Sequence, residues 1–503
     1  MIKKVLVANR GEIAMRIFRT CRVMNLPTVA IYTHADRGAL HVRYAEEAWC
    51  ISKDESDTSY LKPEMILEIA KKTGAAIHPG YGFLSENADF ARRCEEEKVI
   101  FIGPSAAVIA QMGVKTEARR IMQEAGVPIV PGTNDPVAGL EDARARAKEI
   151  GYPIMLKALA GGGGKGMRLV RTEDDLDAAF RMSRSEAAHS FGNDAIYIEK
   201  YIENPHHIEV QVLGDKYGNV IHLYERECSI QRRNQKVIEE SPSPFVKEAT
   251  RDKMLAVAVA ACKKIGYYSA GTLEFMMDND QNFYFLEMNT RLQVEHPVTE
   301  ECTGVDLVRD MILVAAGNRL PYKQEDVEFR GAAIECRIYA EDPENNFMPS
   351  PGVIRVREAP EGRNVRLDSA AYAGFEVSLH YDPMIAKLCT WGRNRESAIS
   401  NMKRALREYK ILGIKTTIPF HLRVLQNETF LKGNYDTTFI DTKFDREELK
   451  RRKSNDPTIA IIAAALRHFE QEKDAAARAT TVPLVGESLW KYYGKLQMSA
   501  NNY

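Results

Sequence analysis

The sequence predicts an α/β protein, with α+β character in its later part, and three observations favour this fold class. Apolar runs alternate with helical patterns over residues 1–113. A glycine-rich loop near residue 160 joins two further apolar runs, and short strands separated by turns follow residue 331. A length of 503 residues is enough for about three domains.

The first 113 residues have the pattern of a parallel sheet. Apolar runs at 5–8 and 28–32 predict strands, and the spacing of apolar residues at 13–21 and 63–72 predicts helices. This alternation is typical of βαβ units. The first turn, Asn9-Arg10-Gly11-Glu12, lacks the glycines of a dinucleotide-binding loop, so a dinucleotide-binding domain is disfavoured.

The middle of the chain changes from alternation to hairpins. A charged helix is predicted over 140–150, and strands at 154–159 and 167–171 flank the glycine loop. Two strands joined by a short loop form a hairpin, so antiparallel sheet is expected here.

The last third combines short strands with one long helix. Strands are predicted at 332–339 and 353–356 and a helix over 395–408, before a charged stretch at 445–453. The tail predicts an amphipathic helix from apolar residues at spacings of three and four, at Ile459, Ile462, Leu466 and Phe469. We expect this helix to dock on the C-terminal domain, while Trp490 and Tyr493 either pack with it or help to recruit a partner.

Composition excludes several classes of protein. Lys and Arg number 69 and Asp and Glu 70, a balance that argues against a nucleic-acid binder. The eight cysteines show no C-x-x-C pair, so neither a zinc site nor a disulfide framework is expected. The start has no leader pattern and the apolar runs are too short to span a bilayer, so we expect a cytoplasmic protein without a membrane partner.

The loop Gly161–Gly166, with Lys165, is the first candidate site. Consecutive glycines let backbone N–H groups approach an anion, and Lys115 and Lys157 nearby suit the phosphates of a nucleoside triphosphate. Met167 follows where a Walker A loop needs Lys-Ser/Thr. The alternative is a flexible surface hairpin.

Two carboxylates and an amide form the second candidate site. Glu287 and Asn289 share one face of an extended segment. If a hairpin turns at Asp280-Gln281, Glu274 lies opposite Glu287, and such oxygen ligands suit Mg²⁺ or Mn²⁺. The alternative is a solvated acidic face.

The third candidate follows at once in the chain. Arg291, Gln293 and Glu295 alternate, so an extended path presents all three to a small oxyanion and its proton. The alternative is a surface ion pair. A basic run with Arg232, Arg233 and Lys236 is by itself more typical of a solvated face, and for His206 and His207 a nucleotide contact and a structural role are equally compatible.

These residues stand in motifs that resemble the biotin carboxylase family of the ATP-grasp superfamily. The resemblance runs from residue 2 to about 442 and is carried by VANRGEIA (7–14), HPGYGFLSEN (78–87), GGGGKGM (161–167), EKYIENPHHIEVQVLGD (199–215), ERECSIQRRNQKVIEE (225–240), EMNTRLQVEHPVTE (287–300) and GAAIECRIYAEDP (331–343). It implies a parallel-sheet domain (1–113), an ATP-grasp domain (114–330) with a lid at about 131–203, a C-terminal domain (331–445) and a helical tail (446–503) that docks a partner.

The resemblance also implies roles for individual residues. The expected ATP contacts are Lys115, Lys157, Gly163, Gly164, Glu199, Lys200, Tyr201, Ile202, His207, Asn234, Glu274 and Glu287, and the expected metal ligands are Glu274, Glu287 and Asn289. Bicarbonate is expected at Lys236, Arg291, Gln293 and the backbone of Val294, with Glu295 as the base and Arg337 on biotin. The sequence departs from the family pattern at Asn234, where His is common, and in a glycine loop with one glycine fewer.

The implied activity is that of a carbon–nitrogen ligase. ATP and bicarbonate would form carboxyphosphate, which carboxylates biotin on a carrier protein, as the first half-reaction of an acyl-CoA or pyruvate carboxylase. The implied cofactors are ATP and about two Mg²⁺ or Mn²⁺ ions. The implied partners are a biotin carboxyl carrier protein, a second copy in a homodimer and a carboxyltransferase subunit, because the chain has no Met-Lys-Met biotinylation motif.

Two alternatives remain open at this point. One is a catalytically silent scaffold subunit, which predicts losses among the seven clamp residues, yet all are present: Lys236, Glu274, Glu287, Asn289, Arg291, Glu295 and Arg337. The other is an ATP-grasp ligase that acts on a different acceptor.

Overall fold

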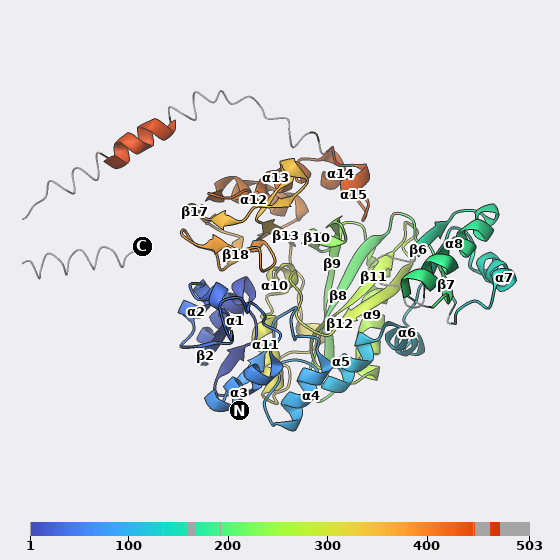
Figure 1. Cartoon of the computed structure of the whole chain (residues 1–503), viewed down its shortest axis with the longest axis horizontal. Coiled ribbons are helices and arrows are strands. Elements are labelled where there is room, and N and C mark those ends of the chain that lie inside the picture. Colours follow the sequence, from blue (N-terminus) through green and yellow to red (C-terminus); the bar gives the residue numbers. More distant parts are fainter. Residues whose placement is uncertain are drawn as a thin grey trace, which may run out of the picture. The chain divides into compact units, whose positions relative to one another are not determined.

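The computed structural model describes residues 2–133, 135–158, 167–191, 193–445, 447 and 463–472. The chain divides into two compact units, residues 1–445 and 446–503. All of the candidate site residues belong to the first unit, which contains three layers of structure important for the site (Figure 1).

The first layer is the predicted parallel sheet, with strand order β3-β2-β1-β4. The strands are β1 (Val5–Val7), β2 (Thr28–Tyr32), β3 (Glu47–Cys50) and β4 (Ala76–His78), and the helices that follow them are α1 (Gly11–Val23), α2 (Leu40–Tyr44), α3 (Pro63–Thr73), α4 (Ala88–Glu96) and α5 (Ala106–Gly113). The residues of β1 are fully buried, as expected of a strand that is covered on both faces.

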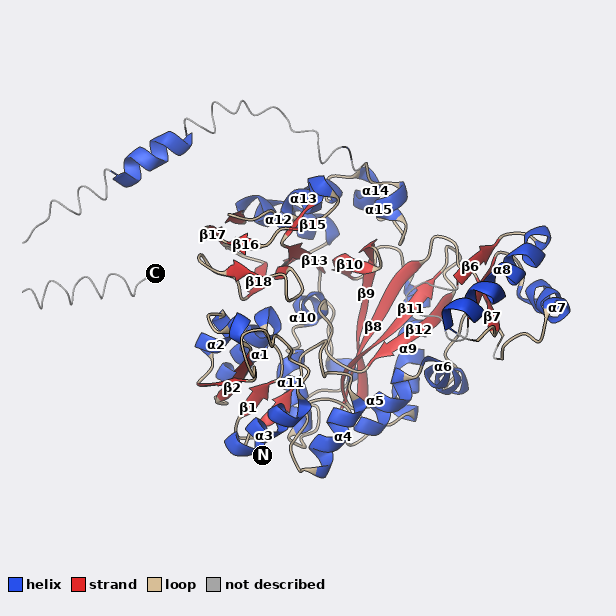
Figure 2. Cartoon of the chain, viewed as in Figure 1, coloured by secondary structure: helices blue, strands red, loops and turns tan. Residues whose placement is uncertain are grey.

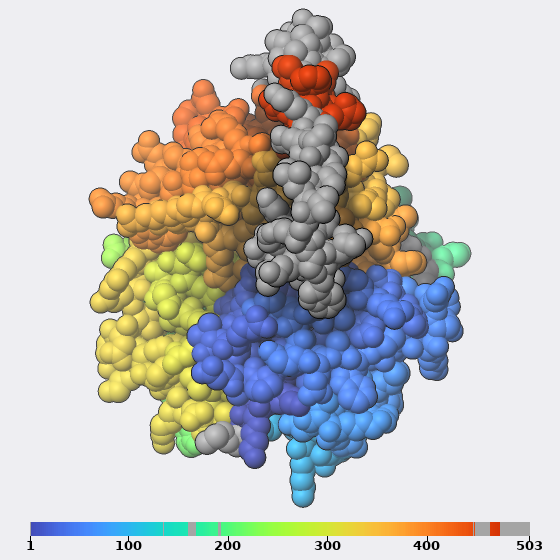
Figure 3. Space-filling view, turned by 90° about the vertical axis from the view of Figure 1, so that its left-hand side faces the viewer, coloured from blue at the N-terminus to red at the C-terminus, as the bar shows by residue number. Residues whose placement is uncertain are grey.

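One core joins this layer to a distant part of the chain. Phe18 and Ile17 of α1 pack in the same apolar cluster as Leu307 and Met311 of α11 (Leu307–Ala315). Figure 3 shows the N-terminal residues, in blue, directly beside the yellow residues of this later segment. The N-terminal layer is therefore anchored to the rest of the first unit by a shared core.

A small sheet, β6-β5-β7, forms the second layer. It contains β5 (Ile154–Ala158), β6 (Met167–Val170) and β7 (Ile196–Lys200), packed against α7 (Leu140–Ile150) and α8 (Glu173–Phe191). Strands β5 and β6 pair antiparallel, which confirms the predicted hairpin; its loop, residues 159–166, lies outside the described residues. Its apolar side chains, such as Leu156 and Phe180, form a core of their own.

The third layer is an eight-stranded sheet in the order β12-β11-β8-β9-β10-β13-β20-β18. The strands are β8 (His206–Gly214), β9 (Val220–Arg232), β10 (Gln235–Ser241), β11 (Ser269–Met277), β12 (Phe283–Asn289), β13 (Ala332–Tyr339), β18 (Val365–Ser369) and β20 (Met384–Gly392). Figure 2 shows the long strands β8, β9, β11 and β12 side by side. Because β10 pairs with β13, the sheet continues through the expected domain boundary at residue 331.

Further helices and short strand pairs complete this part of the first unit, and several of the helices pack against the sheet. The helices are α6 (Lys115–Glu124), α9 (Glu248–Lys264), α10 (His296–Thr303), α12 (Arg395–Glu408), α13 (Ile418–Val424), α14 (Glu428–Leu431) and α15 (Phe439–Thr442), and the strand pairs are β14 (Glu341–Asp342) with β15 (Met348–Pro349), β16 (Gly352–Val353) with β19 (Glu376–Val377), and β17 (Val356–Glu358) with β21 (Lys410–Leu412). The single strand predicted at 353–356 is wrong, because the chain leaves one strand pair and enters another there.

The second unit is described only in part. Residues 463–472 are helical, within the predicted amphipathic segment, and Leu466 and Phe469 are exposed. Ile459, Ile462, the charged stretch beyond residue 447 and the aromatic pair Trp490 and Tyr493 lie outside the described residues, so docking of this helix stays a prediction. Among the helices that the structure describes, none has the length and apolar character to cross a bilayer.

Candidate functional site

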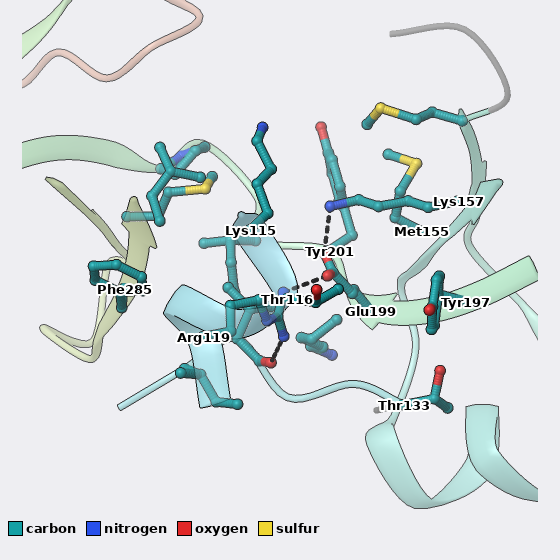
Figure 4. A pocket seen from close by; sticks show the side chains of 18 of the residues that line it. Lys115, Thr116, Arg119, Thr133, Met155, Lys157, Tyr197, Glu199, Tyr201 and Phe285 are labelled. Atoms are coloured by element: carbon teal, nitrogen blue, oxygen red, sulfur yellow. Dashed lines mark hydrogen bonds and ion pairs between the residues drawn. The ribbon is translucent and has the colours of Figure 1, made fainter. Parts of the chain in front are cut away.

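A cavity of about 980 Å³ lies between helix α6, the small sheet and the end of the hairpin β11–β12 (Figure 4). Lys115 lines it from α6 and Lys157 lines it from β5, so that two ammonium groups reach the cavity from different walls. Phe285 and Leu286 of β12 add apolar surface. A cavity with an apolar wall and two lysines suits a nucleotide, whose base and phosphates need these two environments.

An ion-pair network keeps the cations of this cavity in place. The carboxylate of Glu199 pairs with Lys157 and, at 2.5 Å, with Arg119. Burial opposes the ionisation of Glu199, but Lys157 and Arg119 outweigh burial and lower its pKa. Glu199 is therefore a charged residue that orients cations rather than a free ligand for a phosphate.

The structure brings most of the expected ATP contacts together. Seven of them line the cavity: Lys115, Lys157, Glu199, Lys200, Tyr201, Ile202 and Asn234. His207, Glu274 and Glu287 belong to the carboxylate cluster described next, whereas Gly163 and Gly164 lie outside the described residues. Sequence reasoning missed Thr116, Arg119, Met155, Tyr197, Thr437 and Thr438. Among these residues, only Arg119 could have been found from the sequence, because it lies four residues after Lys115 and would share one face of a helix with it.

The hairpin β11–β12 places Glu274 directly opposite Glu287, as predicted. The route to this register differs from the prediction. The N–H of Asp278 bonds to the carbonyl of Asn282, so the loop has three residues instead of two. A β-bulge at Leu286 then shifts the ladder by one residue and restores the pairing of the two carboxylates. The bulge also lets two consecutive residues, Phe285 and Leu286, line the nucleotide cavity.

The carboxylate pair fits a divalent cation. Burial, reinforced by the neighbouring Glu274, raises the pKa of Glu287, and no cationic side chain among the described residues forms an ion pair with it. Asn289, two residues after Glu287 on the same strand, donates a hydrogen bond of 2.8 Å to Glu274. Two carboxylates and an amide oxygen are hard ligands of the kind that Mg²⁺ and Mn²⁺ prefer, and a cation there would offset the repulsion between the carboxylates.

Lys236 of β10 is the central cation of the adjoining cluster. Its ammonium pairs with Glu209, with Glu274 at 2.8 Å and with Glu295 at 2.9 Å. Burial opposes its charge, but the three carboxylates outweigh burial and raise its pKa well above the ordinary value. Lys236 therefore contacts both Glu274, an expected metal ligand, and Glu295, the predicted base.

Glu295 lies between two cations. Its second oxygen accepts a hydrogen bond of 3.0 Å from Arg337 of β13, which also pairs with Glu239 at 2.6 Å. Burial opposes the ionisation of Glu295, but Lys236 and Arg337 together lower its pKa. Without substrate the carboxylate is thus held ionised by the two residues expected to bind bicarbonate and biotin.

The segment 291–295 is not the extended path that was predicted. It is an irregular turn that leads into α10. Gln293 still reaches the cluster, with its amide nitrogen 2.6 Å from Glu274. Arg291 instead pairs with Glu86 at 2.7 Å and bonds to Asn289 at 2.8 Å, beside the carboxylate pair. Arg291, Gln293 and Glu295 thus belong to one network of hydrogen bonds and ion pairs. They are brought together by the turn and not by the alternation of a strand.

Sequence reasoning missed Arg226 and Glu209 in the buried floor of this network, although His207 was among the expected ATP contacts. Arg226 is fully buried and bonds to Glu209 and to the amide oxygen of Gln293, which leaves the NH₂ group of Gln293 as a donor to the site. His207 lies 3.0 Å from Glu274; burial opposes its charge, but Glu274 and Glu209 raise its pKa to about 9. The signal was present, because His207, Glu209 and Gln211 alternate with apolar residues on β8.

The basic run is only partly a solvated face, because Arg233 is exposed whereas Arg232 and Lys236 are withdrawn from solvent. Arg232 is buried against Glu341 at 2.5 Å, and Arg233 and Asn234, both with positive φ, form the tight turn between β9 and β10. His206 stacks on Phe245 at 3.5 Å between ring centroids, a structural role.

Comparisons with known proteins match nearly the whole first unit. Residues 1–109 match the family model "Biotin carboxylase, N-terminal domain", residues 114–323 match "Carbamoyl-phosphate synthase L chain, ATP binding domain", and residues 335–442 match "Biotin carboxylase C-terminal domain".

One curated relative and two solved structures are similar over most of their own length. Biotin carboxylase 1 of Bacillus subtilis is 57% identical over 444 residues, 88% of this chain and 99% of the relative. The crystal structure of the biotin carboxylase subunit of pyruvate carboxylase is 50% identical with a TM-score of 0.82 and covers 90% and 100% of the two chains. The crystal structure of the biotin carboxylase domain dimer of Hydrogenobacter thermophilus 2-oxoglutarate carboxylase, with MgADP, ADP and bicarbonate, is 51% identical with a TM-score of 0.80 and covers 88% and 97%.

Proposed function

This chain belongs to the biotin carboxylase family, and from that premise we propose how its residues divide the work of carboxylating biotin with ATP and bicarbonate. The observation that carries the proposal is the position of Glu295, held between Lys236 and Arg337 beside the carboxylate pair. One base thus adjoins a site for phosphoryl transfer on one side and a buried guanidinium on the other.

The nucleotide occupies the cavity described above. Lys115 and Lys157 bind phosphate oxygens, and Phe285 and Leu286 contact the apolar part of the nucleotide. Lys157 already forms an ion pair with Glu199, so a bound phosphate would share the ammonium of Lys157 with that carboxylate. This arrangement keeps Lys157 oriented when no nucleotide is bound.

Glu274, Glu287 and Asn289 would hold the Mg²⁺ or Mn²⁺ that accompanies ATP. When bound, the metal neutralises charge on the transferring phosphoryl group. The ammonium of Lys236 lies 2.8 Å from the carboxylate of Glu274, so Lys236 would share that carboxylate with the metal. Lys236 is therefore placed between a residue that would hold the metal and the residues that bind the anion.

Bicarbonate binds between Lys236, Arg291 and the NH₂ group of Gln293, with the backbone N–H of Val294 as a further donor. Glu295 removes its proton, and a bicarbonate oxygen then attacks the γ-phosphorus of ATP to give carboxyphosphate and ADP. An oxyanion bound by Lys236 takes one cation from Glu295, which raises the affinity of that carboxylate for a proton. Substrate binding in this way prepares the base.

Carboxyphosphate divides into CO₂ and phosphate, and the phosphate takes the proton from the biotin N1 nitrogen, which then attacks CO₂. Arg337 stabilises the negative ureido oxygen that develops in this step. Its present partners, Glu239 and Glu295, keep it buried and charged until biotin enters.

Partners follow from the similar structures. One is described as the biotin carboxylase subunit of pyruvate carboxylase, and the 2-oxoglutarate carboxylase domain is described as a dimer. We propose that this chain forms a homodimer and works with a biotin carboxyl carrier protein and a carboxyltransferase subunit. Acetyl-CoA, pyruvate and 2-oxoglutarate are all compatible final acceptors.

An omission assay tests the function. ADP formation is measured with purified full-length chain, ATP, Mg²⁺, bicarbonate and free biotin, and each component is left out in turn. We expect biotin to accelerate ADP formation only when bicarbonate is present. Biotin-independent turnover at the full rate would instead favour a ligase with another acceptor, and no turnover at all would favour the scaffold subunit.

A further inference from the structure

Lys387 of β20 is a buried lysine that the functions above do not use. It lies directly opposite Arg337 of β13 in one antiparallel pair and opposite Asp368 of β18 in the next. Directly opposed residues project from the same face of a sheet. Lys387 and Arg337 are therefore neighbours on the face that α10 covers, and the side chain of Lys387 is fully buried.

The ammonium of Lys387 contacts the turn that carries the base. It donates a hydrogen bond of 2.8 Å to the carbonyl oxygen of Val294, which belongs to the peptide between Val294 and Glu295. Helix α10 begins one residue later, at His296. The carbonyl of this peptide and the carboxylate of Glu295 are thus fixed from two neighbouring positions of one sheet, by Lys387 and Arg337.

Glu12 places a carboxyl group beside Lys387 from a different layer. Its carboxylate, on α1 of the N-terminal sheet layer, lies 3.5 Å from the ammonium of Lys387. Both oxygens of Glu12 are buried and have no hydrogen-bond partner among the described residues. A buried lysine is costly unless opposite charge is near, and against the effect of burial Lys387, after Arg366, helps to lower the pKa of Asp368, so Asp368 and Glu12 make the position of Lys387 possible.

We propose that Lys387 is a positioning residue for carboxylation: it holds the Val294–Glu295 peptide so that the Glu295 carboxylate and the Val294 backbone face bicarbonate. This inference rests on the base role proposed for Glu295. Reacting groups must be aligned to within a fraction of an ångström, and a misplacement of about 1 Å costs about a hundredfold in rate. Lys387 has no place among the residues that line the nucleotide cavity, so ATP binding should not depend on it.

The test replaces Lys387 by methionine, which keeps the length of the stem and removes the donor. In Lys387→Met we expect kcat for bicarbonate- and biotin-dependent ADP formation to fall by at least about tenfold and KM for bicarbonate to rise, because the peptide is released. KM for ATP should stay within about twofold of the wild-type value, since the cavity is unchanged.

Two further variants separate positioning from stability. Arg395→Met removes another ion pair at this sheet, between Arg395 of α12 and Glu240 of β10 at 2.6 Å and away from the turn, and is expected to keep wild-type kcat while lowering Tm. If Lys387→Met does not fold, the double variant with Glu12→Gln removes both charges, a change that is often tolerated, and decides the question instead.

The outcomes are distinct. A folded Lys387→Met or double variant with wild-type kcat overturns the proposal, as does an equal loss of kcat in Arg395→Met at matched Tm. If the wild-type chain shows no biotin- and bicarbonate-dependent ADP formation in the omission assay, the proposed function itself is contradicted. If the wild-type chain shows this activity, the result of the variants bears on the role of Lys387 alone.

Discussion

At the scale of single residues, the site is held by competition between fixed charges. The ammonium of Lys236 pairs with three carboxylates, those of Glu209, Glu274 and Glu295. Arg337 forms a second ion pair with Glu295. Each carboxylate offsets its desolvation through these contacts, so the loss of one charge redistributes the others. A charged substrate that binds here is therefore expected to change which of these ion pairs are formed.

Glu295→Gln tests the proposed base. The amide keeps the shape of the side chain but cannot accept the proton of bicarbonate, so we expect kcat for bicarbonate-dependent ATP cleavage to fall by about a hundredfold or more. KM for ATP should change by no more than a few-fold, because Glu295 does not line the nucleotide cavity. Steady-state kinetics measure both values, and unchanged turnover would remove Glu295 from the role of base.

Glu12→Gln should change how stability depends on pH. Burial raises the pKa of Glu12 from 4.5 to about 7, with Lys387 acting against the rise. A carboxyl group whose pKa is higher in the folded state stabilises the fold when it is protonated, so this contribution is present below about pH 4.5 and is lost as pH rises through about 7. Tm measured from pH 5 to pH 8 should therefore decline less in Glu12→Gln than in the wild type. Parallel curves for the two proteins would contradict this account.

At the scale of elements, the sequence predicts regular structure well and its interruptions poorly. The strand at 332–339 and the helices at 140–150 and 395–408 have the predicted bounds, because their apolar spacing is uninterrupted. The register of Glu274 and Glu287 was predicted correctly with a two-residue turn that does not exist. The three-residue loop and the bulge at Leu286 cancel, and no residue type in FYFLEMN signals a bulge.

The bulge has a consequence for nucleotide binding. Leu286 lines the cavity only because the ladder is interrupted there, and truncation to alanine removes apolar contact worth about 1 kcal/mol. We expect Leu286→Ala to raise KM for ATP by about fivefold with kcat nearly unchanged. Leu412→Ala, which truncates an exposed leucine of β21, is the matched control. Equal KM values for the two variants would show that the bulge does not shape the nucleotide site.

At the scale of the whole molecule, the site depends on contacts that no local pattern reveals. Arg226 lies 67 residues from Gln293 and Lys387 lies 93 residues from Val294, and the eight-stranded sheet brings Lys387 to its partner by pairing strands across residue 331. Sequence motifs located the reacting groups. Arg226 lies inside a recognised motif that assigned it no role, and Lys387 lies outside the motifs, so their contacts became visible only in the fold.

The tail offers a prediction about assembly. Truncation after Gly486 removes Trp490 and Tyr493, which are aromatic residues of the kind enriched at interface centres. We expect the truncated chain to keep its activity on free biotin and to lose co-purification with its carrier or carboxyltransferase partner. Complete assembly of the truncated chain with the partner would rule out this role of the tail.

The central claim is that bicarbonate is phosphorylated before biotin is carboxylated, and an oxygen label tests it most directly. Attack of a bicarbonate oxygen on the γ-phosphorus, followed by release of CO₂, leaves that oxygen in inorganic phosphate. With ¹⁸O-labelled bicarbonate and unlabelled water, mass spectrometry of the phosphate formed in a short reaction should find about one labelled oxygen transferred per ADP. Phosphate without label, formed at the same rate as ADP, would mean that water attacks ATP and would contradict the account.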